Sequence, residues 1–225
     1  MSVKDIKYNL EIINRRITAA CQRSGRQSGD VTLIAVTKTV NSEIMHKAYE
    51  AGLRHFGENR VQEADRKYQE LADIRDDITW HMIGHLQSNK VNKTLYMFDT
   101  IHSIDSISLA ETINRKADRT VPALLQVNIG EELSKSGFSP DEIFKAFETA
   151  SKMTRLEIRG LMTIAPLVNN PEEVRPVFKK LREIRDQLGL KELSMGMTDD
   201  FEVAVEEGAT MIRIGRAIFG ERIYK

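Results

Sequence analysis

The feature that most constrains the fold is a regular alternation of short apolar segments with helix-like segments between residues 31 and 215. Short apolar runs bounded by turn residues predict buried strands, and strands separated by helices predict a parallel sheet. Eight such strands closed into a ring form a (β/α)8 barrel, and the 225 residues present are close to the usual length of about 250. An open doubly wound sheet is the alternative. The eight predicted strands are 33–37, 54–56, 79–83, 100–102, 123–129, 157–162, 192–195 and 211–214.

The segment before the first strand predicts an extra N-terminal helix. Its apolar residues recur at spacings of three or four, which is the period of one buried helical stripe, and Ser2 with Asp5 forms a candidate capping box. No linker or change of composition divides the chain, so we expect a single domain over residues 1–225. The stripe consists of Ile6, Leu10, Ile13, Ile17 and Cys21.

Composition excludes several classes of function. Lys+Arg and Asp+Glu both count 33, so the chain lacks the basic excess that nucleic-acid binding requires. The single cysteine, Cys21, excludes an internal disulfide framework and a zinc site built on cysteines. No apolar run reaches the roughly 18 residues of a membrane helix, and the first 25 residues lack the apolar core of a signal peptide. We therefore expect a cytoplasmic protein that binds neither nucleic acid nor membrane.

The first candidate for chemistry is Lys38, at the end of the first predicted strand. Functional groups of a (β/α)8 barrel gather at the carboxyl ends of the strands. Side chains alternate along a strand, so Lys38 shares a face with Ile34 and Val36. If this face points into the barrel, a partly desolvated amine would have a lowered pKa and could form a Schiff base with a carbonyl compound. The alternative is a solvated lysine at a strand end.

Two later loops are candidates for binding an anion. Met197 and Thr198 follow the seventh strand at the start of a predicted helix, where backbone N–H groups and a hydroxyl would suit a phosphate. Gly215 ends the eighth strand, where a missing side chain would let a phosphate approach the backbone. The loops after strands seven and eight are the usual phosphate site of this fold. Each loop can also be interpreted as helix-capping residues and a strand-ending glycine.

Three polar residues in or next to predicted strands need partners. Arg213 lies between two isoleucines, where an unpaired guanidinium would be costly, so it requires either a structural carboxylate or a ligand acceptor. His81 and His85 would share a face of an extended segment and could hold a metal. No third ligand occurs at a recognisable spacing, so histidines satisfied by neighbouring groups are the favoured interpretation.

Six motifs occur in a fixed order along the chain. They are VTK (36–38), FGENRVQE (56–63), WHMIGHLQSNK (80–90), SKSG (134–137), SMGMT (194–198) and RIG (213–215). In this order they resemble the pyridoxal phosphate homeostasis protein family, from about residue 31 to residue 221. Several of the motifs are six or more residues long, which makes the resemblance specific.

The resemblance implies an α/β fold: a single (β/α)8 TIM barrel with an extra N-terminal helix, like the N-terminal domain of alanine racemase (fold type III among proteins that bind pyridoxal 5′-phosphate, PLP). It also implies that PLP is held as a Schiff base. Lys90 and Lys135 are either a second docking place for PLP or surface charge. The cofactor-binding residues it implies are Lys38 at the Schiff base, Asn59 beside the ring, Arg213 at the pyridine nitrogen, and Met197, Thr198, Gly215 and Arg216 at the phosphate.

The resemblance also frames the choice between a carrier and an enzyme. An amino-acid racemase of this type needs a second base, a tyrosine that its family draws from the second domain of a partner subunit. The chain ends five residues after Gly220, which we interpret as leaving no room for that domain. We therefore expect a monomer that binds and buffers PLP and hands it to PLP-dependent apo-enzymes, without strong catalysis. The alternative is a weak racemase or another PLP-dependent enzyme.

Overall fold

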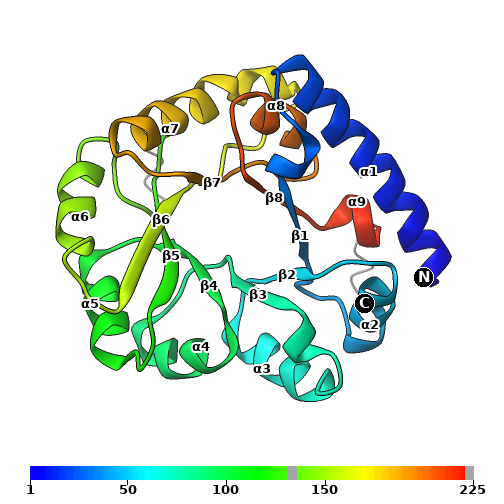
Figure 1. The fold of residues 1–225 in the computed structure, drawn as a ribbon, viewed down its shortest axis with the longest axis horizontal. Helices are drawn as coiled ribbons and strands as arrows, with labels where there is room; N and C mark the ends of the chain where they lie inside the picture. Colours follow the sequence, from blue (N-terminus) through cyan, green and yellow to red (C-terminus); the bar gives the residue numbers. More distant parts are fainter. Residues whose placement is uncertain (131–135, 221–225) are drawn as a thin grey trace.

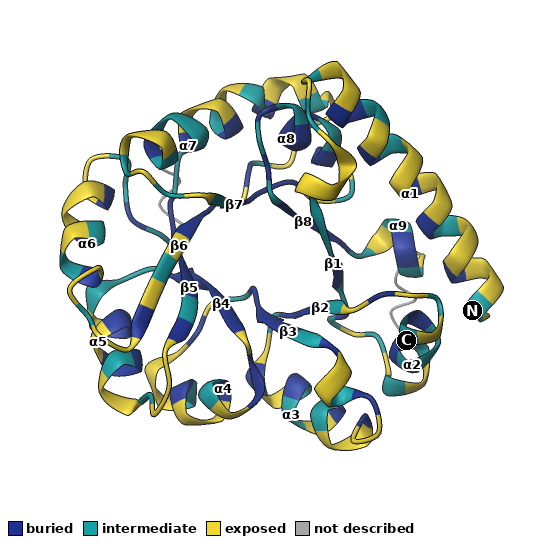
Figure 2. Ribbon diagram, viewed as in Figure 1, coloured by how far each residue is buried: buried dark blue, intermediate teal, exposed yellow. Residues whose placement is uncertain are grey.

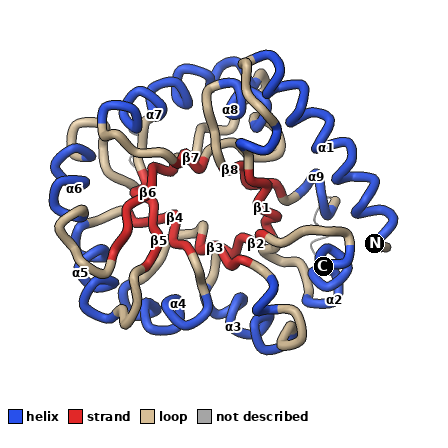
Figure 3. Tube along the Cα trace, viewed as in Figure 1, coloured by secondary structure: helices blue, strands red, loops and turns tan. Residues whose placement is uncertain are grey.

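Eight parallel strands form a closed barrel, surrounded by a ring of helices (Figures 1 and 3). The computed structural model describes residues 1–130 and 136–220. Neighbours in the barrel follow chain order, and β1 pairs with both β2 and β8, which closes the sheet. The (β/α)8 prediction is therefore confirmed, and the open sheet is wrong. The strands are β1 (Thr32–Val36), β2 (His55–Glu58), β3 (Thr79–Met82), β4 (Thr100–Ile104), β5 (Val121–Gln126), β6 (Leu156–Met162), β7 (Glu192–Ser194) and β8 (Met211–Ile214).

The helices cover the outside of the barrel, and most of them expose one face (Figure 2), whereas α8 has no exposed residue. None of those in the described part of the chain is both long and apolar enough to span a membrane. The helices are α1 (Val3–Arg23), α2 (Ser42–Glu50), α3 (Val61–Glu70), α4 (Val91–Met97), α5 (Ile107–Lys116), α6 (Ile143–Ala150), α7 (Arg175–Gln187), α8 (Phe201–Glu206) and α9 (Arg216–Phe219).

Helix α1 is the predicted extra helix, and it packs along α8 and α9 (Figure 1). All five residues of the predicted stripe are buried. The capping box also forms: the backbone N–H of Ser2 donates to Asp5 Oδ2 at 2.8 Å, and the N–H of Asp5 donates to Ser2 Oγ at 3.2 Å. The backbone N–H groups of Ser2 and Asp5, which have no acceptor within the helix, are thereby each bonded by the side chain of the other residue.

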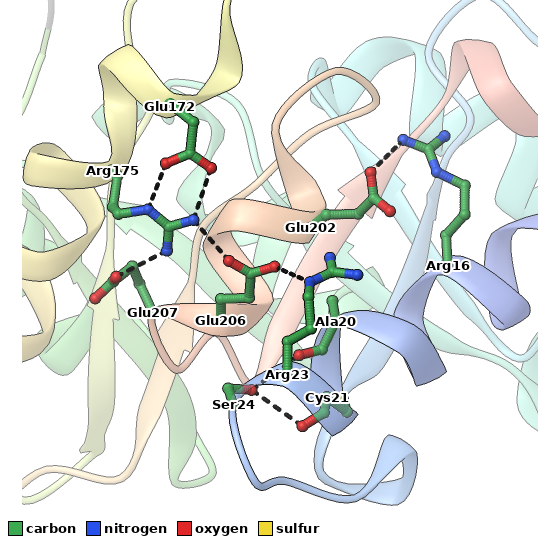
Figure 4. Close-up of polar contacts among 10 residues, drawn as sticks. All are labelled: Arg16, Ala20, Cys21, Arg23, Ser24, Glu172, Arg175, Glu202, Glu206 and Glu207. Carbon is green, nitrogen blue, oxygen red and sulfur yellow. Dashed lines mark hydrogen bonds and ion pairs between the residues drawn. The ribbon is translucent and has the colours of Figure 1, made fainter.

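Ion pairs attach α1 to the barrel at its polar edge (Figure 4). Arg16 donates to Glu202 of α8 at 2.8 Å, and Arg23 donates to Glu206 at 2.6 Å. Glu206 also accepts a hydrogen bond from Arg175 of α7 at 2.6 Å. Glu206 therefore links α1, α7 and α8 through one carboxylate.

The carboxyl ends of β2 and β5 differ from the sequence predictions. The second strand was expected to end at residue 56, yet β2 continues to Glu58, because Gly57 and Glu58 pair with His81 and Met82 of β3. The fifth strand was expected to reach residue 129 but ends at Gln126. Both differences lie at the carboxyl ends of strands, where the chain leaves the sheet.

Candidate functional site

A cavity of about 570 Å³ opens at the carboxyl ends of the strands. Its walls come mainly from the segments that follow β1, β2, β7 and β8, with Ile83, Ile164 and Phe219 as apolar lining. These segments are far apart in the sequence and meet only because the barrel closes. All seven sequence-predicted site residues line this one cavity: Lys38, Asn59, Met197, Thr198, Arg213, Gly215 and Arg216.

Lys38 lies two residues beyond β1, half-buried, in a turn with unusual backbone geometry. Its neighbour Thr39 has a φ of 68°, a left-handed conformation that is unfavourable for a β-branched residue. The Thr39 N–H donates to Glu63 Oε1 at 2.6 Å, and the Val40 N–H donates to the Thr37 carbonyl at 2.8 Å. Strained conformations persist only where surrounding contacts hold them. The backbone of the turn that carries Lys38 is therefore held by its surroundings.

The group that holds this turn is a buried ion cluster around Lys67 of α3. The Lys67 side chain is fully buried, and its Nζ donates to the Thr37 carbonyl at 2.7 Å, Glu58 Oε1 at 2.7 Å and Glu63 Oε1 at 2.6 Å. Thr37 Oγ1 donates to Glu58 Oε1 at 2.6 Å. Burial raises the pKa of Glu58, and Lys67 opposes that rise. Burial alone would also raise the pKa of Glu63, but the bond from Lys67 brings it below its usual value.

Sequence reasoning missed this cluster, although one signal was present. Lys67 occupies an apolar position of α3, in step with the buried residues Val61 and Ala64 and followed by Leu71. A lysine is almost never fully buried unless it is paired. A lysine within an apolar helical stripe therefore predicts a buried carboxylate partner, although it does not say which.

The segments after β7 and β8 bring together the residues predicted to bind an anion. Thr198 and Gly215 line the same cavity, and Gly215 precedes α9, where the N–H groups of Ile218 and Phe219 donate to the Gly215 carbonyl at 3.0 Å. A Cβ added to Gly215 would lie 3.3 Å from the Val36 carbonyl oxygen, so the chain passes close to β1 here. Arg216 pairs through its side chain with Asp199.

Met197 differs from the expectation in one respect. Its backbone N–H donates to Asp200 Oδ1 at 2.5 Å, so this donor already has an acceptor within the protein. Asp200 is buried, and burial raises the pKa of its carboxyl. Met197 lines the cavity, but the phosphate donor expected from its backbone is engaged by Asp200.

Arg213 is almost fully buried at 4% exposure, and its hydrogen-bond partners are neutral. Its Nη1 donates to Ser194 Oγ at 2.6 Å and its Nη2 donates to the Thr163 carbonyl at 2.8 Å. Within residues 1–130 and 136–220, no carboxylate forms an ion pair with it. Burial lowers the pKa of Arg213 to about 10, against the influence of Asp200, so the side chain is still a cation at neutral pH. The structural-carboxylate interpretation is therefore wrong.

The two histidines considered as a metal pair lie in different environments. His81 is inside the barrel, between His55 and His102, with nitrogen–nitrogen distances of 3.1 and 3.0 Å. His85 is exposed and hydrogen-bonds Asp105 at 2.7 Å. No cluster of potential metal ligands occurs among the residues that the structure describes. The favoured interpretation, histidines satisfied by neighbours, agrees with these contacts.

Of the two lysines considered for a second site, Lys90 does not line this cavity. Lys90 lines a neighbouring surface hollow together with Arg60, Arg66 and His85, and the hollow shares Asn59 with the main cavity. Lys135 lies outside the described residues.

The family whose sequence pattern matches the chain is described as alanine racemase, N-terminal domain, and the match covers residues 6–223. A pyridoxal phosphate homeostasis protein of Aquifex aeolicus is 44% identical over 224 residues, which cover 96% of this chain and 97% of the relative. The protein of the same name in Pseudomonas aeruginosa is 41% identical, and the match covers 97% of this chain and 96% of that relative.

Solved structures give the same grouping. PipY of Synechococcus elongatus, a structure with PLP bound, is 41% identical with a TM-score of 0.83, covering 96% of this chain and all of that chain. An alanine racemase of Clostridium difficile is 14% identical with a TM-score of 0.74. The match covers all of this chain and 59% of the racemase, and at this identity it shows a common fold only. Because the chain is 44% and 41% identical to these relatives over nearly their full length and matches the alanine racemase N-terminal domain, it belongs to the pyridoxal phosphate homeostasis protein family.

Proposed function

We propose that the protein binds PLP in the cavity at the carboxyl ends of the strands, with Lys38 as the residue that forms the Schiff base, and that it buffers and hands over this cofactor. The observation that carries the proposal is the convergence of seven residues from four distant segments on one cavity. The 41% identical PipY has a structure with PLP bound, which supports the same ligand here.

The chemistry of the cavity walls fits this ligand. PLP carries an aldehyde, a pyridine nitrogen and a phosphate, and when bound it supplies an electrophilic carbon for amines. Arg213 is a donor-only cation suited to a ring nitrogen, while the Thr198 hydroxyl and the backbone N–H groups of Gly215 and Arg216 suit a phosphate. Asn59 also lines the cavity, and its Oδ1 is buried without a hydrogen-bond partner among the described residues.

The same residues favour a carrier over an enzyme. A guanidinium that faces the pyridine nitrogen can only donate, so it disfavours a protonated ring and weakens the ring as an acceptor of electrons. Racemisation would also need a second base opposite Lys38. Of the four tyrosines in the described part of the chain (Tyr8, Tyr49, Tyr68 and Tyr96), none lines the cavity.

We further propose that the protein acts as a single-domain monomer in the cytoplasm. A closed barrel leaves no unpaired sheet edge to associate with another copy. PLP-dependent apo-enzymes are the proposed recipients of the cofactor, because they bind the same aldehyde through a lysine of their own.

The test of function is the absorption spectrum of the purified protein mixed with PLP, followed by incubation with L-alanine in heavy water. We expect the band of a protein-bound Schiff base and no deuterium at Cα above the level with free PLP. Absence of the band would overturn PLP binding through Lys38. Deuterium incorporation well above free PLP would favour the weak racemase instead.

A further inference from the structure

A line of four polar side chains crosses the barrel interior and ends on Arg213. Ser194 Oγ accepts from Arg213 Nη1 at 2.6 Å and lies 2.9 Å from His102 Nδ1. His102 Nε2 lies 3.0 Å from His81 Nδ1, and His81 Nε2 lies 3.1 Å from His55 Nδ1. The residues come from β7, β4, β3 and β2, so the line runs across the barrel.

The interior members of this line are closed off from solvent. Ser194 and His102 are fully buried and His81 is 4% exposed, whereas His55 at the far end is half-buried and borders a surface hollow with Lys7 and Arg54. Burial lowers the pKa of His81 to about 3 and that of His102 well below its usual value. Burial also lowers the pKa of His55. All three imidazoles are therefore neutral at neutral pH.

One donor-only group sets the direction of every bond in the line. Arginine has no acceptor, so Ser194 Oγ must accept from Arg213, and among the described contacts only His102 Nδ1 can take the hydroxyl proton. A neutral imidazole that accepts at Nδ1 carries its proton at Nε2, so His102 donates to His81. By the same reasoning His81 donates to His55. All three rings are then Nε2–H tautomers.

This arrangement has a consequence for the cavity. A buried guanidinium is usually balanced by a carboxylate, which would cancel its charge. Here neutral groups that polarise one another stabilise it instead, and the nearby Asp200 acts on it only without direct contact. The positive charge therefore remains available to a ligand in the cavity.

We propose that Ser194, His102, His81 and His55 are positioning residues that form one directional hydrogen-bond chain, which holds Arg213 as an oriented cation, with no carboxylate in direct contact, for the bound cofactor. The proposal rests on the proposed function for the identity of the ligand. The direction of the hydrogen-bond chain does not rest on the proposed function, because it follows from contacts within the protein alone.

The direction can be measured in the apo protein by long-range proton–nitrogen NMR of histidines labelled with ¹⁵N at pH 7.5. The protein has five histidines, and the surface residues His46 and His85 can be assigned by His→Gln variants and serve as references. We expect neutral Nε2–H rings at His55, His81 and His102. An Nδ1–H tautomer or a cationic ring at His81 or His102 would overturn the proposal.

The link to the cavity is tested by Ser194→Ala beside a matched control, Ser103→Ala. Ser103 is also buried and donates to the Gly84 carbonyl at 2.6 Å, but it is not part of the hydrogen-bond chain. Ser194→Ala should weaken PLP binding by roughly tenfold, equivalent to one hydrogen bond to a charged group, and change the spectrum of the bound cofactor. Ser103→Ala should change neither.

Equal loss of affinity in the two serine variants would mean a general loosening of the barrel and would overturn the positioning role. Failure of the wild-type protein to bind PLP would overturn the proposed function. In that case the histidine tautomers measured in the apo protein would still decide the direction of the hydrogen-bond chain.

Discussion

Replacing Lys67 with Met should destabilise the protein by about 3–5 kcal/mol, because it leaves the buried carboxylate of Glu58 without its cation. The two side chains are fully buried and 2.7 Å apart, so water cannot substitute for the lost ammonium group. For a protein of this size, each kcal/mol lowers the melting temperature by roughly 2–4 °C. We therefore expect the variant to melt about 6–20 °C below the wild type.

The loss should also depend on pH with a defined sign. Burial already raises the pKa of Glu58, and removal of Lys67 removes the group that opposes this rise. A carboxyl whose pKa is raised in the folded state favours folding when protonated, and this contribution disappears as pH rises through the raised value. Lys67 also lowers the pKa of Glu63, so its removal raises that pKa and makes the variant lose further stability as pH rises. The difference between variant and wild type should therefore be small at pH 5 and larger at pH 8.

Urea unfolding at pH 5, 6.5 and 8 measures this difference. A matched control is Lys93→Met, which removes a lysine that is 61% exposed and paired with Asp65 at 2.6 Å; it should change the free energy of unfolding by less than about 1 kcal/mol. Adding Glu58→Gln to Lys67→Met should recover much of the lost stability. Our reasoning would be refuted if Lys67→Met and Lys93→Met lost the same amount, or if the loss at pH 5 equalled that at pH 8.

Three further predictions concern the cavity and its supports. Pyridoxal, which lacks the phosphate, should bind at least about tenfold more weakly than PLP in an equilibrium titration, and equal affinity would assign the loops after β7 and β8 a structural role only. Gly196→Ala should lower the thermal melting temperature and PLP affinity together, because Gly196 has a φ of 90° and an added Cβ would lie 2.6 Å from Ala204 Cβ; an unchanged variant would contradict this. Light scattering should find a monomer, and a stable dimer at low micromolar concentration would reopen the case for a base supplied by a partner subunit.

Much of the fold could be predicted because it follows from local patterns. The spacing of apolar residues identified α1 and its capping box, and branched apolar runs between helices identified all eight strands. Closure of the barrel was inferred only from the number of strands, since no local signal distinguishes a closed sheet from an open one. Boundaries such as the end of β2 at Glu58 were missed, because a buried glutamate is tolerated there only through the hydrogen bonds from Lys67 and Thr37.

The site was predicted in part for the same reason. Residues at strand ends, such as Lys38 and Gly215, could be placed from the order of the strands and from family motifs. The partners of Arg213 could not, because Ser194 of the neighbouring strand β7 and Thr163 after β6 are brought to it only by strand pairing, which the sequence does not give. The histidine chain was missed because His55, His81 and His102 have no regular spacing in the sequence and are joined only by neighbouring strands.

The measurement that tests the central claim most directly is borohydride reduction of the protein loaded with PLP, followed by peptide mapping. Reduction converts a Schiff base into a stable secondary amine, so the modified peptide identifies the lysine. We predict one main adduct, on Lys38, and its loss in Lys38→Ala while the apo protein keeps a wild-type melting temperature. An adduct found mainly on Lys90 or Lys135, or unchanged labelling in Lys38→Ala, would contradict the account.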